Sequence, residues 1–414
     1  MRTILLALLA LSVAGCLSEK GTNPGSTPTF IRYYNGGNND DAVAIEETAD
    51  KGFIILVSTK IQKAEADIPV YKIKLIRTDQ NGNPIWTRIY PDISDKVNNY
   101  SASNLQILSN GGYVVVGNDI QSDGTNKVLL MTVEDSKGDA VKIQMATTKP
   151  SEEGRAVAVN AKGNFLVLST SGSSVMSLSE ISKDSLKNNA KVHSNWTVPY
   201  SAGATTLANR LFVDEVGKVV WSGVATKNGL TGIRLVKTTQ DSEFTDFDLL
   251  ISIPTINEIG TDICRYGFGY AVTGSTNQKA GQTAAGSDTD ILFKRLASDG
   301  TVLSTQSFPF DTSGSDNQND TGNSISSTQD GGLIILSSVN SAAIGGKGDT
   351  DYYLIKVDAF GQKTWFSTFG SIYKDNGVAV RQTSDGGYVV LGTTTQGGLK
   401  LVALIKTNSV GKIL

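Results

Sequence analysis

The feature that most constrains this chain is a short segment that recurs seven times along its 414 residues. In the clearest copies, residues 49–56, 329–336 and 384–391, a turn containing Gly leads into a β-branched run. The residues that follow the seven turns are Phe53, Tyr113, Phe165, Val219, Tyr270, Leu333 and Tyr388. The regular spacing of these seven positions indicates a repeat architecture rather than several separate domains.

Each copy has the order of elements expected for a four-stranded blade. In the sixth copy we expect strand A at residues 323–328, B at 333–337, C at 352–357 and D at 363–369. The turns A–B and C–D contain the Gly and Asn residues that tight hairpins require, and no helical period separates the strands. This pattern predicts antiparallel blades of a β-propeller and disfavours a parallel α/β fold.

The two ends of the repeat array complement each other. The seventh copy ends at Leu414, just into its strand D, and residues 29–37 resemble the strand D of residues 364–370. The N-terminal strand would therefore complete the last blade and remove both exposed sheet edges. We predict an all-β fold, a seven-bladed β-propeller of four-stranded antiparallel blades, as one domain over residues 29–414.

Composition narrows the possible functions. With 37 Lys and Arg against 40 Asp and Glu, the chain lacks the basic excess of a nucleic-acid-binding surface, so we expect no nucleic-acid partner. A single His excludes a multi-histidine metal centre. We therefore predict no metal and no cofactor, and this shortage of His favours binding over catalysis.

Residues 1–15 have the pattern of a secretory signal peptide, with Arg2 followed by an apolar run that is too short to span a membrane. Val13-Ala14-Gly15-Cys16 resembles the lipobox of bacterial lipoproteins. The resemblance implies cleavage before Cys16, acylation of that residue with chains such as palmitate, and an outer-membrane lipoprotein that is periplasmic or surface-exposed. Residues 16–28 would form the lipidated tether. An ordinary signal peptide with a chance Cys remains the alternative.

The turn and strand sequences also resemble known propeller repeats. Asp-Gly-Gly-Tyr at 385–388 and Leu-Ile-Lys-Val-Asp at 354–358 are similar to β-propeller repeats of bacterial envelope and secreted proteins. Trp86 and Trp365 follow C–D turns, as Trp does in the propeller lipoprotein of the outer-membrane protein assembly machinery. These resemblances imply the fold and a tethered scaffold, and leave the ligand open.

Loop length predicts which face of the ring is functional. The A–B and C–D turns are short, whereas several B–C and D–A connections are long, and variable loops on a rigid scaffold commonly bind ligands. Carboxylates at strand A starts or before strand C would lie on this B–C/D–A face. The predicted ligand-binding residues are Asp40, Asp41, Glu153, Asp320, Asp375, Asp290 and Asp351. Alternatively, these residues cap loops and bond backbone between blades.

The leading functional hypothesis is a non-enzymatic, lipid-anchored binding or scaffold propeller of the bacterial envelope, with a protein or glycan as partner. One alternative is a polysaccharide-active enzyme that uses acids near the central channel, Asp320 and Asp375 among them. Another is an accessory factor in outer-membrane assembly or secretion. We expect His193 to be a surface residue and Cys264 to be a small core residue within a strand A.

Overall fold

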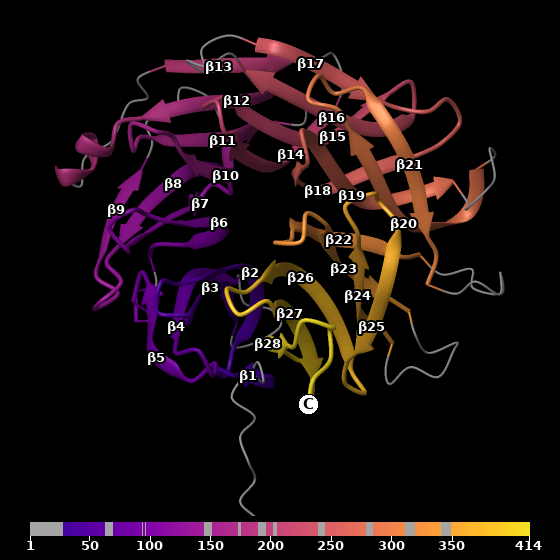
Figure 1. The fold of residues 1–414 in the computed structure, drawn as a ribbon. Coiled ribbons are helices and arrows are strands. Elements are labelled where there is room, and N and C mark those ends of the chain that lie inside the picture. Colours follow the sequence, from indigo (N-terminus) through magenta and orange to yellow (C-terminus); the bar gives the residue numbers. More distant parts are fainter. Residues whose placement is uncertain are drawn as a thin grey trace, which may run out of the picture.

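Seven four-stranded sheets are arranged in a ring in this computed structural model (Figure 1). It describes residues 28–62, 69–92, 94–95, 97–144, 151–172, 175–188, 196–201, 205–238, 245–278, 285–310, 319–340 and 349–414. The prediction of an all-β, seven-bladed β-propeller is confirmed. Within these residues the only helix is a six-residue 3-10 helix, η1 (Lys183–Asn188), and no helix is long and apolar enough to cross a membrane.

In every blade strand A is innermost and strand D outermost (Figure 1). Blade 1 consists of β2 (Asn39–Glu47), β3 (Phe53–Ile61), β4 (Val70–Thr78) and β5 (Pro84–Tyr90). Blade 2 consists of β6 (Tyr100–Ile107), β7 (Tyr113–Ile120), β8 (Asn126–Val133) and β9 (Ala140–Gln144). Blade 3 consists of β10 (Glu152–Val159), β11 (Phe165–Ser171), β12 (Val175–Ile181) and β13 (Trp196–Ser201).

The other four blades follow the same order. Blade 4 consists of β14 (Thr205–Val213), β15 (Val219–Lys227), β16 (Leu230–Thr238) and β17 (Thr245–Ile251). Blade 5 consists of β18 (Glu258–Tyr266), β19 (Gly269–Gln278), β20 (Ala285–Leu296) and β21 (Val302–Phe308). Blade 6 consists of β22 (Thr321–Ser327), β23 (Leu333–Val339), β24 (Asp351–Val357) and β25 (Lys363–Phe369). Blade 7 consists of β26 (Lys374–Gln382), β27 (Tyr388–Gln396), β28 (Leu399–Thr407) and β1 (Phe30–Tyr34).

Blade 7 is closed by the N-terminal strand, as predicted. Strand β1 pairs antiparallel with β28, with Phe30 opposite Lys406, so the indigo start of the chain lies beside its yellow end (Figure 1). The Thr29 hydroxyl and the Leu414 backbone N–H are 3.0 Å apart. The chain therefore enters the ring at the C–D end of blade 7.

The A–B turns of blades 1, 6 and 7 share a Thr-x-Asp-x-Gly sequence. In blade 7 the Asp385 carboxylate accepts hydrogen bonds from the Thr383 hydroxyl at 2.6 Å and the Gly387 N–H at 3.0 Å. The same carboxylate pairs with Lys406 on strand C at 3.0 Å. Blades 1 and 6 repeat this arrangement at Asp50 and Asp330. The turn Asp therefore neutralises a cation whose stem is buried within the blade.

Every A strand carries a β-bulge at the same point. The residue before the bulge is always Ala or Gly: Ala42, Ala102, Gly154, Ala208, Gly260, Gly322 and Gly377. A β-carbon on Gly322 would lie 2.1 Å from Oγ1 of Thr273, on strand B of the preceding blade. Small residues at this position therefore allow adjacent blades to approach closely near the axis.

Apolar side chains fill the space between neighbouring blades. One cluster joins Ile55 and Val57 of blade 1 to Val389 and Leu391 of blade 7, all fully buried. The described residues form seven such clusters, each drawn from two adjacent blades. The hydrophobic core is thus continuous around the ring, and it holds the innermost strands around the axis.

Candidate functional site

The acid at the start of blade 1 lies in a buried ion pair. Asp40 is 1% exposed, accepts a hydrogen bond from the Thr59 hydroxyl at 2.8 Å and pairs with the Lys74 ammonium at 2.5 Å. The contacts of this carboxylate are therefore with other side chains of its own blade, as in a structural ion pair.

Two further predicted acids, Asp375 and Asp351, meet between blades 6 and 7. Both are buried, and a β-carbon on Gly370 would lie 2.0 Å from Oδ1 of Asp351 and 3.0 Å from Oδ2 of Asp375. Asp375 also accepts hydrogen bonds from the Ser371 N–H at 2.6 Å and the Thr394 hydroxyl. The D–A connection is therefore folded tightly over both carboxylates.

Asp320 and Asp290 occupy the corresponding place between blades 5 and 6. Both are buried, and Oδ2 of Asp320 accepts the Phe310 N–H at 3.3 Å. Desolvation, together with the Asp320 carboxylate, raises the pKa of Tyr353 to about 12. The Asp320 backbone N–H donates to the Thr289 carbonyl at 2.8 Å, which ties the two blades together.

The remaining predicted acids are exposed and ion-paired. Asp41, 43% exposed, lies 2.7 Å from the Lys400 ammonium. Glu153, 36% exposed, pairs with Arg155 and accepts a hydrogen bond from the Asn126 amide at 3.0 Å. The seven predicted acids thus lie at several different positions around the ring, some of them in pairs between neighbouring blades, and their role in ligand binding stays a prediction.

Sequence reasoning missed the residue that repeats most regularly at these joints. The side-chain oxygens of Asn39, Asn99, Asn257 and Asn319 each accept a backbone N–H from the start of strand C in the preceding blade, at 2.7 to 3.0 Å. A sequence signal was available, because Asn39, Asn257 and Asn319 each directly precede an acid at the expected start of a strand A.

Two buried glutamates were missed as well. Glu258 of blade 5 pairs with Lys294 at 2.6 Å, and the two side chains are 0% and 1% exposed. In blade 3 the buried acid is Glu152, which accepts a hydrogen bond from the Ser169 hydroxyl at 2.6 Å. Glu152 and the predicted Glu153 are neighbours, and a shift of one residue changes the face of a strand, so the structural acid of this blade and the predicted ligand-binding acid have different surroundings.

Arginines on the A strands form the most distinctive charged feature near the axis. Four of the seven innermost strands carry one: Arg155, Arg210, Arg265 and Arg381. Arg210 lies 3.5 Å from Asp262 of blade 5, and Arg381 lies 3.1 Å from Glu46 of blade 1. These pairs cross from one blade to the next, so they bring both signs of charge to the innermost layer of the ring.

The guanidinium groups of Arg155 and Arg210 keep hydrogen-bonding capacity. Their side chains are 35% and 30% exposed. The buried Nε of Arg155 has no hydrogen-bond partner, and 3.5 Å between Arg210 and Asp262 is longer than a charge-assisted hydrogen bond of about 2.7–2.9 Å. The exposed part of each of these two guanidinium groups could therefore donate to an anionic group on a ligand.

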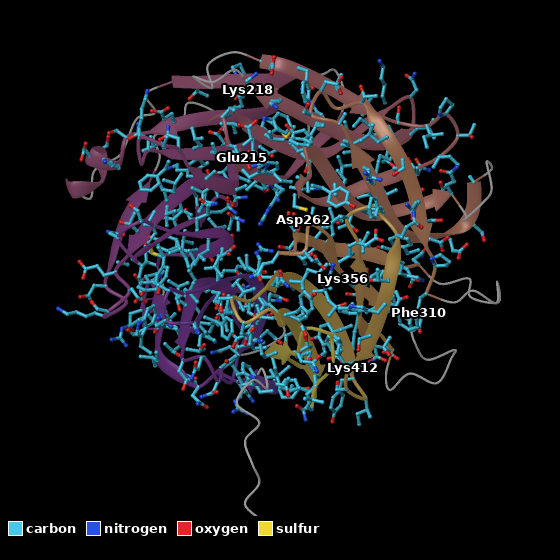
Figure 2. The ribbon with its side chains drawn as sticks, in the orientation of Figure 1. Glu215, Lys218, Asp262, Phe310, Lys356 and Lys412 are labelled. Carbon is cyan, nitrogen blue, oxygen red and sulfur yellow. The ribbon has the colours of Figure 1, made fainter. Side chains whose placement is uncertain are left out.

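Asp262 lies where the innermost strands converge (Figure 2). Its carboxylate accepts the Ser324 hydroxyl at 2.9 Å and the Ile325 N–H at 3.0 Å from blade 6. Cys264 lies two residues further along the same strand. Desolvation and the charge of Asp262 raise the pKa of the Cys264 thiol to about 12, which keeps it protonated and unreactive at neutral pH.

No metal centre is found among the described residues, which contain no group of three or more His, Cys, Asp or Glu side chains that could hold an ion. Cys16 and His193 lie outside the described residues. Two hollows open on the A–B/C–D face. One, of about 790 Å³, lies at the turns of blade 2, and one of about 340 Å³ lies between blades 6 and 7 beside Trp365.

Comparison with known proteins defines the fold but no family. No protein-family model matches the sequence, and the search of curated proteins gives no match. An ulvan lyase of a polysaccharide lyase family superposes with a TM-score of 0.56 and 10% identity, over 92% of this chain and 97% of that one. The polysaccharide lyase Uly1 gives 0.50 and 10%, over 96% of each chain. Sqt1 of Chaetomium thermophilum, bound to the N-terminus of ribosomal protein L10, gives 0.50 and 12%, over 91% and 98%.

These neighbours place the chain in the class of β-propellers that includes both enzymes and protein-binding modules. They also correct our expectation that the chain is not an enzyme. Two of the solved structures that match it over nearly their whole length are polysaccharide lyases. The shortage of His was a poor guide because carboxylates and arginines can perform or assist cleavage without it.

Proposed function

We propose that this chain is an enzyme that cleaves a polysaccharide, with a uronate-containing polymer as the preferred substrate class. The observation that carries the proposal is the set of arginines on the innermost strands, above all Arg155 and Arg210 with their partly exposed guanidinium groups. A planar guanidinium binds a carboxylate in a bidentate manner, which suits the uronate of an acidic sugar.

The carboxylates beside these arginines supply the second chemical requirement. Glu153 lies next to Arg155 and is 36% exposed, so a bound sugar could reach it. Carboxylates serve as proton donors and acceptors in the cleavage of glycosidic bonds. The whole-length resemblance to an ulvan lyase and to the polysaccharide lyase Uly1 supports a polysaccharide as the substrate.

A panel of uronate-containing and neutral polysaccharides tests this function. Cleavage is followed by new reducing ends and by the ultraviolet absorbance of unsaturated products, which separates hydrolysis from elimination. We expect Arg155→Gln to lower kcat/KM by about a hundredfold. Lys218→Gln is the matched control. Lys218 lies on an A–B turn in an exposed ion pair with Asp246, so this change should leave activity unchanged. Equal loss in both variants would refute a site at the innermost strands.

We also propose that the protein is held at the bacterial outer membrane by acyl chains on Cys16. Support comes from the sequence Val13-Ala14-Gly15-Cys16 after a short apolar run. Two or three acyl chains anchor a protein stably where one does not. Labelling of growing cells with a palmitate analogue should mark the protein and fail in Cys16→Ser. Label retained in that variant would contradict acylation at this residue.

A further inference from the structure

Exposed apolar side chains occur at the tips of several turns on the A–B/C–D face. Val216 and Phe268 occupy the tips of the A–B turns of blades 4 and 5 and are 60% and 100% exposed. Phe360 occupies the C–D turn of blade 6 and Val410 the turn that follows strand C of blade 7, and they are 77% and 55% exposed. We name these four residues the turn-tip set.

Two of these tips are held firmly in place. The Arg295 guanidinium of blade 5 donates to the Phe360 carbonyl at 2.8 Å and lies 5.2 Å from the centre of the Tyr266 ring. The Tyr266 hydroxyl in turn donates to the Asp358 carbonyl at 2.7 Å. The turn of Phe360 is thus fastened to the strand that leads into Phe268, and both rings are displayed by a rigid support.

An exposed lysine lies near the tips, and two carboxylates on the same face are paired with buried lysines. Lys412 lies exposed in the segment that follows strand C of blade 7 (Figure 2). On the same face, Asp330 pairs with Lys356 at 2.9 Å and Asp385 with Lys406 at 3.0 Å. Aromatic rings interspersed with basic side chains are typical of surfaces that lie at a lipid interface.

The point where the chain enters the ring lies on the same face. Strand β1 starts at Phe30, opposite Lys406 at the C–D end of blade 7, and Cys16 precedes Phe30 by only fourteen positions. The shortest path from Cys16 therefore leads to the A–B/C–D face. The tips lie on separate hairpins, which suits a fluid apolar phase better than a protein partner, whose contact would need a continuous apolar centre.

From this geometry we infer that the A–B/C–D face of blades 4 to 7 docks on a lipid surface through the turn-tip set. The B–C/D–A face, with its long loops, then points away from the membrane. This inference draws on the proposed anchor at Cys16 for the direction of the tether, but the turn tips make it testable without acylation.

The test uses the full chain carrying Cys16→Ser and vesicles of phosphatidylethanolamine and phosphatidylglycerol with brominated acyl chains. We introduce a Trp at a tip as Phe268→Trp or Phe360→Trp. When the protein binds these vesicles, the brominated acyl chains should quench the fluorescence of the introduced Trp. Ile372→Trp is the matched control, because Ile372 is 71% exposed on the D–A connection at the opposite face. Quenching of neither tip at saturating lipid, or equal quenching at position 372, would overturn the inference.

A second variant separates lipid docking from contact between copies. Phe268→Ser combined with Phe360→Ser should weaken vesicle binding at least about tenfold, because two exposed rings no longer enter the apolar layer. Sedimentation velocity should show the same assembly state for the double variant as for the parent chain. If self-association is lost while vesicle binding is unchanged, the tips belong to an interface between copies and the inference is wrong.

Discussion

The buried pair of Glu258 and Lys294 offers the sharpest test of the energetics described here. The change Glu258→Gln keeps the size of the side chain but leaves the Lys294 ammonium, 1% exposed, without its charged partner at 2.6 Å. Removing one member of a buried ion pair costs about 3–5 kcal/mol, since the other charge remains desolvated. Equilibrium unfolding in urea, followed by intrinsic fluorescence, should show this loss.

Two further variants make the measurement specific. Asp246→Asn disrupts the exposed pair with Lys218, whose side chains are 40% and 28% exposed, and should change the free energy of unfolding by less than about 1 kcal/mol. Glu258→Leu combined with Lys294→Met removes both buried charges and should recover most of the stability. If Glu258→Gln costs no more than the Asp246 variant, the buried pair does not contribute as argued.

Three other predictions follow from single contacts. Despite partial desolvation, hydrogen bonds from Thr328 and Lys356 lower the pKa of Asp330 from 3.8 to about 2, so its contribution is complete above about pH 4 and is lost as pH falls toward 2. Since this carboxylate is 61% exposed, Asp330→Asn should only slightly reduce the change in the urea unfolding midpoint between pH 5 and pH 2.5. In Cys16→Ser, a thiol reagent at pH 8 should label native Cys264 about a thousandfold more slowly than the urea-unfolded chain; equal rates contradict its raised pKa. Phe30→Ala should cost about 3–5 kcal/mol in urea unfolding by cutting the buried contact of β1, with Ile31→Ala, 40% exposed, as control.

The sequence predicted the repeat and its closure because these depend on local chemistry. Gly turns followed by β-branched runs place the start of each strand B, and β23 begins at Leu333 as the pattern indicated. Pairing of β1 with β28 followed from the resemblance of residues 29–37 to a strand D. Turn residues act within a few positions, so no tertiary knowledge was needed.

The environment of the acids could not be predicted in the same way. The partner of Glu258 is 36 positions away, and that of Asp40 is 34 positions away, so each pair exists only once the blade has formed. The bulge after Gly154 also breaks the alternation of the strand, so the sequence alone does not show that Glu152 is the buried acid of this blade. The presence of an arginine on four of the seven A strands became clear only after the innermost strands were known.

The molar-mass distribution of a uronate-containing polysaccharide, measured by size-exclusion chromatography during incubation with the protein, tests the central claim most directly. The account predicts steady shortening of the polymer by the wild-type chain, with Arg155→Gln slower by about a hundredfold. An unchanged distribution with acidic and neutral polymers alike, or shortening at the same rate by Arg155→Gln, would contradict it.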